Sequence, residues 1–297
     1  MQRPLERMPI RRLNRVRVVL LAALALAASA LAWGFLVEPG LLVLERHTLA
    51  LARWPASYPD LHVAAIADLH AGAPFIGLDK VREVVARTNA THPDLIVLLG
   101  DYVIQYVPGG HPIPIEPIAA EFAKLEAPLG TIAVLGNHDW WGGGGHIRRA
   151  FEAVGITVLD NQAMKLDWQG RPLWLAGIAD AKTRHPDFAK ALARVDLAQP
   201  TIVLSHSPAP FAEMPDGPVI MLAAHTHGGQ VRLPLIGSLI VADGIPHRWM
   251  FGHIHEGGHE TGHDMFVSTG IGTSYLPVRF LTPPAIDLFD IRGAAPQ

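Results

Sequence analysis

Five short apolar runs end next to aspartate, asparagine or histidine, and this pattern restricts the fold more than any other feature of the sequence. The runs are 61–67, 95–99, 131–135, 201–204 and 219–223. Their lengths and flanking residues suit buried strands better than helices. In α/β sheets, ligands bind beyond the carboxyl ends of the strands. We therefore expect an α/β domain in which the polar residues after these runs gather at one edge of a central pair of sheets.

The segments between and after these runs complete a pattern of short alternating elements. We expect further strands at 41–51 and 173–177, β-like runs at 248–251, 265–268 and 286–291, and helices at 78–90, 115–125, 146–154 and 186–195. The 28 glycines and 25 prolines are spread along the chain and indicate many connecting loops. With no internal repeat and no obvious linker beyond 38–59, a single domain over 38–297 is expected.

The first 37 residues have the features of a membrane signal. Residues 16–37 contain one charged side chain, Arg17, and at about 1.5 Å per residue they span a hydrocarbon core of roughly 30 Å. Six arginines precede or begin this segment, and the positive-inside rule then keeps the leader in the cytoplasm. We expect a single-pass anchor in a bacterial cytoplasmic membrane, with the domain over 38–297 outside it. The alternative is export after signal cleavage near the small residues 28–32.

Composition excludes two classes of protein. The chain has no cysteine, so disulfides and thiolate metal sites are absent. The net charge of −3 combines an Arg-rich leader of about +5 with a mildly acidic body. Nucleic acids select basic surfaces, so no nucleic-acid partner is expected.

The polar residues that follow the apolar runs are oxygen and nitrogen metal ligands. They are Asp68, His70, Asp101, Asn137, His206, His225 and His227. This mixed set suits Mn, Fe or Zn better than Ca or Mg alone. Two metal ions about 3.5–4 Å apart need a bridging ligand, and Asp101 is the candidate carboxylate. Such a pair generates a bridging hydroxide as nucleophile and stabilises the charge of a phosphoryl transition state.

The two residues after Asn137 are the candidate catalytic groups that do not bind metal. His138 is expected to protonate the leaving oxygen as a general acid, and Asp139 to orient its ring. Trp140 and Trp141, followed by the glycine run 142–145, predict either a lid over the site or a packed loop.

Five motifs in this order resemble those of the calcineurin-like metallophosphoesterases over nearly the whole of 38–297. They are Asp68-Leu69-His70, Gly100-Asp101, Gly136-Asn137-His138-Asp139, Ser205-His206 and His225-Thr226-His227-Gly228-Gly229-Gln230. Segments 177–180, 270–272 and 277–280 resemble the membrane-anchored or exported bacterial branch. Ala67 and Ala224 stand where serine and glycine are common in the family, and we expect these departures to alter packing rather than activity.

The resemblance implies a four-layer α/β/β/α sandwich with two metal ions. It assigns one ion to Asp68, His70, Asp101 and His227, and the other to Asp101, Asn137, His206 and His225. His138 would be the acid. We therefore expect a hydrolase of phosphomonoesters or phosphodiesters. The alternatives are a pyrophosphatase acting on a lipid-linked substrate, such as a nucleoside-diphosphate glycolipid, and a non-catalytic scaffold, which the complete ligand set disfavours.

Two further groups of polar residues each allow either a functional or a structural interpretation. His253, His255, His259 and His263 form either an extra metal site or, as we expect, the exposed side of a hairpin with a Gly-rich turn. Arg232, Arg248 and Arg279 are weak candidates for binding a substrate phosphate, since most arginines are surface residues.

Overall fold

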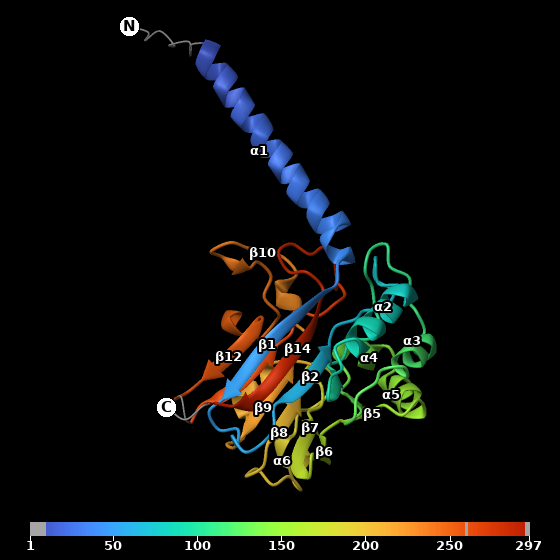
Figure 1. Cartoon of the computed structure of the whole chain (residues 1–297). Coiled ribbons are helices and arrows are strands. Elements are labelled where there is room, and N and C mark those ends of the chain that lie inside the picture. The colour runs from blue at the N-terminus through green and yellow to red at the C-terminus, as the bar shows by residue number, and fades with distance from the viewer. Residues whose placement is uncertain (1–9, 259–260, 295–297) are drawn as a thin grey trace.

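A long helix and a two-sheet body make up the chain in the computed structural model, which describes residues 10–258 and 261–294 (Figure 1). Helix α1 (Ile10–Leu36) projects from the body, and a 3-10 turn (Glu38–Gly40) leads from it into the first strand. Within the segment 14–40 an 18-residue window has a mean hydropathy of 2.3, and the helix is long and apolar enough to cross a membrane. The helix therefore includes most of the predicted span and begins before it, at Ile10.

The first sheet contains six strands. Their order is β1 (Val43–Leu51), β14 (Ala285–Gly293), β2 (Leu61–Ile66), β3 (Leu95–Leu98), β4 (Thr131–Ala133) and β5 (Thr157–Val158). Strand β1 is parallel to β14, and β14 is antiparallel to β2, which begins a parallel run through β3 and β4 to β5. Strands β2–β4 therefore run opposite to β1. Their carboxyl ends lie at the end of the sheet where α1 joins the body.

The second sheet also has six strands. Their order is β12 (Gly252–Glu256), β13 (His263–Val267), β9 (Val219–Ala223), β8 (Thr201–Leu204), β7 (Arg171–Gly177) and β6 (Gln162–Trp168). The four inner strands are parallel, and the two edge strands are antiparallel to their neighbours. A separate hairpin, β10 (Arg232–Leu233) and β11 (Gly237–Ser238), lies near the end of α1 (Figure 1).

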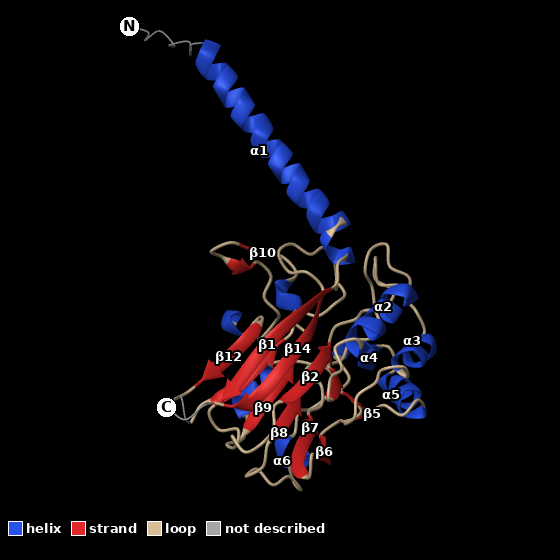
Figure 2. Ribbon diagram, viewed as in Figure 1, coloured by secondary structure: helices blue, strands red, loops and turns tan. Residues whose placement is uncertain are grey.

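Helices cover the outer faces of both sheets, as Figure 2 shows. The first sheet carries α2 (Leu78–Asn89), α3 (Ile115–Phe122), α4 (Asn137–Trp141) and α5 (Gly144–Ala153), and the second carries the short α6 (Phe188–Ala191) and the 3-10 turns Ala209–Glu213 and His247–Trp249. On β2, Ala64 and Ile66 pack towards the helices, while Val63 and Ala65 pack between the sheets. This two-residue alternation gives the four layers that the family resemblance implies.

Two predicted elements differ from the structure, and one long strand was not predicted. Residues 248–251 form the end of a 3-10 turn (His247–Trp249) and the bend after it rather than a strand. The Trp249 ring packs 5.3 Å from that of Phe211, and its Nε1 donates to Glu256. The helix expected at 186–195 shortens to α6. Strand β6 was not predicted, since it is a partly exposed edge strand with little apolar periodicity. The other predicted elements begin and end within about three residues of the observed ones.

Candidate metal centre

The seven expected ligands follow the carboxyl ends of five strands and lie in one cluster. They come from the turns after β2 (Asp68, His70), β3 (Asp101), β4 (Asn137), β8 (His206) and β9 (His225, His227). Six of them are buried, and His225 is half-buried. The topology therefore brings together side chains that are up to 159 positions apart in the sequence (Asp68 to His227).

Asp101 occupies the middle of the cluster. Its Oδ2 lies 3.7 Å from Nε2 of His70 and 3.2 Å from Nε2 of His206. Its Oδ1 accepts a hydrogen bond of 2.8 Å from the backbone N–H of His138. One carboxylate oxygen therefore faces a histidine from each of the two expected ligand sets, while the other oxygen is held by the backbone.

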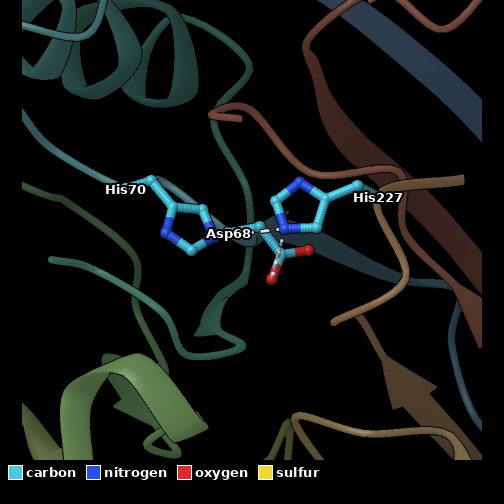
Figure 3. A group of neighbouring side chains, drawn as sticks. All are labelled: Asp68, His70 and His227. Atoms are coloured by element: carbon cyan, nitrogen blue, oxygen red, sulfur yellow. Dashed lines mark hydrogen bonds and ion pairs between the residues drawn. The ribbon is translucent and has the colours of Figure 1, made fainter. Parts of the chain in front are cut away.

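The first ligand set is formed by Asp68, His70 and His227, which Figure 3 shows pointing toward one another. Nε2 of His70 and Nε2 of His227 are 3.1 Å apart, and Nε2 of His227 lies 3.9 Å from Oδ1 of Asp68. One ligand atom from each of the three residues lies within 4.8 Å of the others. The Asp68 carboxylate also accepts the backbone N–H of His225 at 3.1 Å, which links the first set to the second.

The second ligand set surrounds the Nε2 atom of His206. Nδ1 of His206 donates to the carbonyl oxygen of Leu99 at 2.9 Å, and this bond orients the ring so that Nε2 points into the cluster. Nε2 lies 3.1 Å from Nδ1 of His225 and 3.2 Å from Oδ1 of Asn137. Lone pairs of imidazole nitrogens, an amide oxygen and the Asp101 carboxylate converge here, which is the donor set of a transition-metal site. The residues present therefore fit a metal ion.

Electrostatics also favour cations in the cluster. Burial lowers the pKa of both His70 and His225 to about 3, so these rings are neutral ligands at pH 7. Burial acts on His206 in the same direction, but the adjacent Asp101 outweighs it and raises the pKa of His206 to about 10. Burial raises the pKa of Asp68 to about 7. The surroundings thus favour a positive charge beside the carboxylates of Asp68 and Asp101. A bound metal ion would supply this charge in place of the proton on His206.

The backbone of the cluster is strained. Left-handed φ angles occur at Asp68 (45°), His70 (44°), Asp101 (57°), His225 (73°) and His227 (51°). Such conformations cost on the order of 1–3 kcal/mol each in a non-glycine residue and persist only where the surrounding fold imposes them. Here the ends of buried parallel strands fix the turns, and the left-handed residues direct their side chains into one space.

Gly136 is required by the close approach of the turns. A Cβ atom at this position would clash with Oδ1 of Asp101 and would lie 2.7 Å from Nδ1 of His206. The glycine before Asn137 therefore lets the turn after β4 approach the Asp101 carboxylate.

His138 lies at the start of α4 beside the ligand cluster. Its Nε2 is 3.5 Å from Oγ of Ser274, and its ring centroid is 4.7 Å from that of His70. Trp141 covers the other side, with ring centroids 5.2 Å apart. Burial lowers the pKa of His138, so its protonated form is a stronger acid than a free imidazolium.

Asp139 contacts the backbone rather than the ring of His138, which corrects the orienting contact expected from the sequence. Its carboxylate accepts hydrogen bonds from the N–H groups of Gly136 (2.9 Å), Asp101 (2.7 Å) and Tyr102 (2.8 Å). Both of its oxygens are engaged in this way. Asp139 thus ties the turn that carries Asp101 to the start of α4, and it positions the Asp101 carboxylate and His138 together.

A cavity of about 300 Å³ opens over the cluster. Its polar lining includes Asp101, Asn137, His138, Lys182, His225, His227 and Ser274, and its less polar lining includes Ile240, Val241, Tyr275, Leu276 and Val278. Sequence reasoning did not identify Lys182 or Ser274. Neither belongs to a motif, and only the tertiary structure places them beside His138.

Two other expectations from the sequence are resolved by packing. Arg279 was a weak candidate for binding phosphate, but it is fully buried and donates to the carbonyl oxygens of Gly272, Thr282 and Thr269, so its role is structural. The segment from Trp140 to 145 lies within α4, α5 and the turn between them, and Arg184 lies 4.4 Å from the Trp140 ring. These contacts support the interpretation of a packed segment rather than a lid.

The C-terminal histidines lie on a hairpin, as expected. Strands β12 and β13 pair antiparallel, and His253 and His255 on β12 approach Oδ1 of Asp264 at 2.7 and 3.1 Å. Their side chains are 40% and 35% exposed. His259 lies outside the described residues.

A two-sheet sandwich with aspartate, asparagine and histidine ligands at the strand ends defines a metallophosphoesterase. The model of the calcineurin-like phosphoesterase family matches residues 61–257. The chain belongs to this family and is a hydrolase of phosphoric esters.

Curated relatives extend the likeness beyond the family model. The uncharacterized metallophosphoesterase YkuE of Bacillus subtilis is 30% identical over 280 residues, which are 91% of this chain and 94% of the relative. The phosphodiesterase YaeI of Escherichia coli is 33% identical over 234 residues, 74% of this chain and 80% of the relative. Among solved structures, the NAD nucleotidase of Haemophilus influenzae has a TM-score of 0.48 at 13% identity, covering 72% of this chain and 46% of that chain.

Proposed function

We propose that the chain is a dinuclear phosphoester hydrolase whose two metal ions share the carboxylate of Asp101. The observation that carries this proposal is the position of Oδ2 of Asp101, 3.7 Å from Nε2 of His70 and 3.2 Å from Nε2 of His206. One ion would be held by Asp68, His70, Asp101 and His227, and the other by Asp101, Asn137, His206 and His225. The donor set suits Mn, Fe or Zn.

Bound ions would supply Lewis acidity and an activated water at neutral pH. The chain's own residues supply the remaining functions. Lys182 lines the cavity near His138 and His225 and provides a positive charge for a non-bridging phosphate oxygen. His138 lies beside the cluster and donates a proton to the leaving oxygen, and Ser274 at 3.5 Å from its Nε2 orients the ring. Asp139 has a positioning role, because it contacts the backbone that carries Asp101 and His138.

The test is turnover of two chromogenic esters, bis(p-nitrophenyl) phosphate and p-nitrophenyl phosphate, by the full chain in detergent. The protein is stripped of metal and reloaded with Mn, Zn or Fe, and metal content is measured in the same samples. Metal-dependent hydrolysis supports the proposal, and the preferred ester separates diesterase from monoesterase activity. A fully metallated chain that hydrolyses neither ester would support the scaffold alternative.

We infer that α1 is an uncleaved anchor and that the body over 38–297 lies outside the cytoplasm. The Arg-rich leader supports this orientation. The last turn of α1 is bonded to the body, since the backbone oxygen of Gly34 accepts the N–H of Arg279 and Nε1 of Trp33 donates to Glu38. A reporter fused after Gln297 tests the orientation. Reporter activity only in the cytoplasm would overturn it.

A further inference from the structure

Two loops at the α1 end of the body expose large apolar side chains. Leu235, Ile236 and Leu239 form the first group, here named the apolar tip, and they are 108%, 61% and 51% exposed. Ile240, Tyr275 and Leu276 form the second group, here named the cavity wall, and each is at least half exposed. Soluble surfaces rarely expose so many large apolar side chains together, so this surface is suited to contact with an apolar partner.

The cavity wall belongs to the metal centre. Ile240, Tyr275 and Leu276 line the cavity that also contains His138 and His225. The lining of the cavity therefore combines the candidate metal ligands and His138 with large apolar side chains. The apolar tip lies outside the lining of this cavity.

Both loops are tied to the end of α1. The carboxylate of Glu38, two residues beyond the helix, accepts the Nε1 of Trp33 at 2.7 Å and the backbone N–H groups of Leu281 and Thr282. The carbonyl oxygen of Phe280 in turn accepts a hydrogen bond of 2.9 Å from the backbone N–H of Arg232. These bonds connect the last turn of α1 with the loop that carries Tyr275 and with the hairpin that carries the apolar tip.

The topology places these parts at the same end of the body. The ligands follow the carboxyl ends of β2–β4, and this is the end at which β1 begins after α1. Figure 1 shows the β10 hairpin and the loop before β14 beside the lower end of α1. An anchor that crosses a membrane along α1 thus brings the loops and the cavity to the membrane surface.

We propose that the apolar tip inserts into the interface of the bilayer and that the cavity takes an amphipathic phosphoester directly from it. The phosphate would reach the ligand cluster while the hydrocarbon chain lies along the cavity wall. This substrate class rests on the proposed phosphoesterase function, whereas insertion of the tip does not depend on turnover.

The absence of cysteine in the sequence provides a direct test of insertion. Leu235→Cys is labelled with an environment-sensitive fluorophore in the full chain, reconstituted in phosphatidylcholine vesicles that contain nitroxide-labelled lipid. The control is Gln169→Cys, in the exposed turn before β7 at the amino ends of the parallel strands. We expect the nitroxide to quench the label at 235 about twofold or more and the label at 169 hardly at all. Equal quenching at the two positions would overturn insertion.

The substrate class is tested with two esters that share one leaving group, p-nitrophenyl ethyl phosphate and p-nitrophenyl hexadecyl phosphate, in the same vesicles. We expect kcat/KM for the hexadecyl ester to exceed that for the ethyl ester by about tenfold or more, because the longer chain adds apolar contacts. The tip variant Leu235→Asp/Ile236→Asp should lower only hexadecyl turnover, by about fivefold. The matched variant Gln169→Asp/Ala198→Asp, with the same added charge, should lower neither.

The outcomes separate the two proposals. Equal turnover of both esters, or an equal loss of both in the tip variant, would overturn the amphipathic substrate while leaving the phosphoesterase function standing. If the metal-loaded chain hydrolyses neither ester and also fails to hydrolyse p-nitrophenyl phosphate, the phosphoesterase function is overturned, and the quenching result still decides insertion.

Discussion

Two groups of histidines lie in the same molecule, and only one is arranged as a metal centre. His70, His206 and His227 are buried, with their Nε2 atoms directed at carboxylates from other strands. His253 and His255 sit two residues apart on one strand, and both contact the single carboxylate Asp264. The sequence is denser in histidine at the hairpin. Convergence from several buried strands, rather than the number of histidines, therefore distinguishes the site.

Removing the shared carboxylate should have the largest effect. In Asp101→Ala the two ligand sets lose their common oxygen and the charge that stabilises a cation beside His206, so turnover should fall by at least about 1000-fold. Metal analysis should show loss of one or both ions per chain. A variant that keeps both its metal ions and its turnover would show that the buried histidines do not need Asp101.

His138 should affect chemistry without affecting metal binding. His138→Ala should lower kcat by about 10²–10⁴-fold with unchanged metal content, because it removes the acid but none of the proposed ligands. The loss should be greater for an alkoxide leaving group than for p-nitrophenolate, which leaves without protonation. A loss independent of the leaving group would assign His138 to a structural role.

Asp139 should have an intermediate effect. Asp139→Asn keeps the shape but replaces one oxygen with an amide nitrogen that cannot accept the N–H groups of Asp101 or Gly136. We expect about a 10–100-fold loss in activity or metal affinity, as is typical for groups that orient metal ligands. The check is a metal titration followed by turnover. Unchanged metal affinity and unchanged turnover would remove Asp139 from the site.

The hairpin histidines should matter least. Burial alone would raise the pKa of Asp264, but hydrogen bonds from His253 and His255 outweigh burial and lower it. A lowered folded-state pKa stabilises the fold above the unfolded value, and this contribution is lost as pH falls through the folded-state pKa. Asp264→Asn should therefore destabilise the protein by about 1 kcal/mol or less at pH 7.

Thermal unfolding of this variant and the wild type, measured from neutral pH down to about pH 3, provides the check. The difference between them should shrink on acidification, and turnover at pH 7 should be unchanged. A difference that is larger at pH 3 than at neutral pH would contradict the lowered pKa of Asp264. A loss of metal in Asp264→Asn would make the hairpin a part of the metal centre.

The ligands of the candidate metal centre were easier to predict from the sequence than the residues that surround them. Asp68, Asp101 and Asn137 each follow a buried strand, and parallel strands bring such residues together by topology alone. The contact made by Asp139 was not predictable, because a carboxylate beside a histidine in sequence need not face its ring. Lys182 and Ser274 enter the cavity from loops without a pattern. The local sequence around Trp249 predicts a strand, whereas the structure has a 3-10 turn there, because the tertiary contacts of Trp249 do not affect the local apolar periodicity.

The most direct test of the shared-carboxylate centre is a Mn²⁺ titration of the metal-free full chain, followed by electron paramagnetic resonance and turnover together. We expect two Mn²⁺ per chain, an exchange-coupled spectrum from ions that share a ligand, and turnover that rises with the coupled signal. Asp101→Ala should lack this coupled signal. A single Mn²⁺ per chain, or two uncoupled ions with full turnover, would contradict the shared-carboxylate centre.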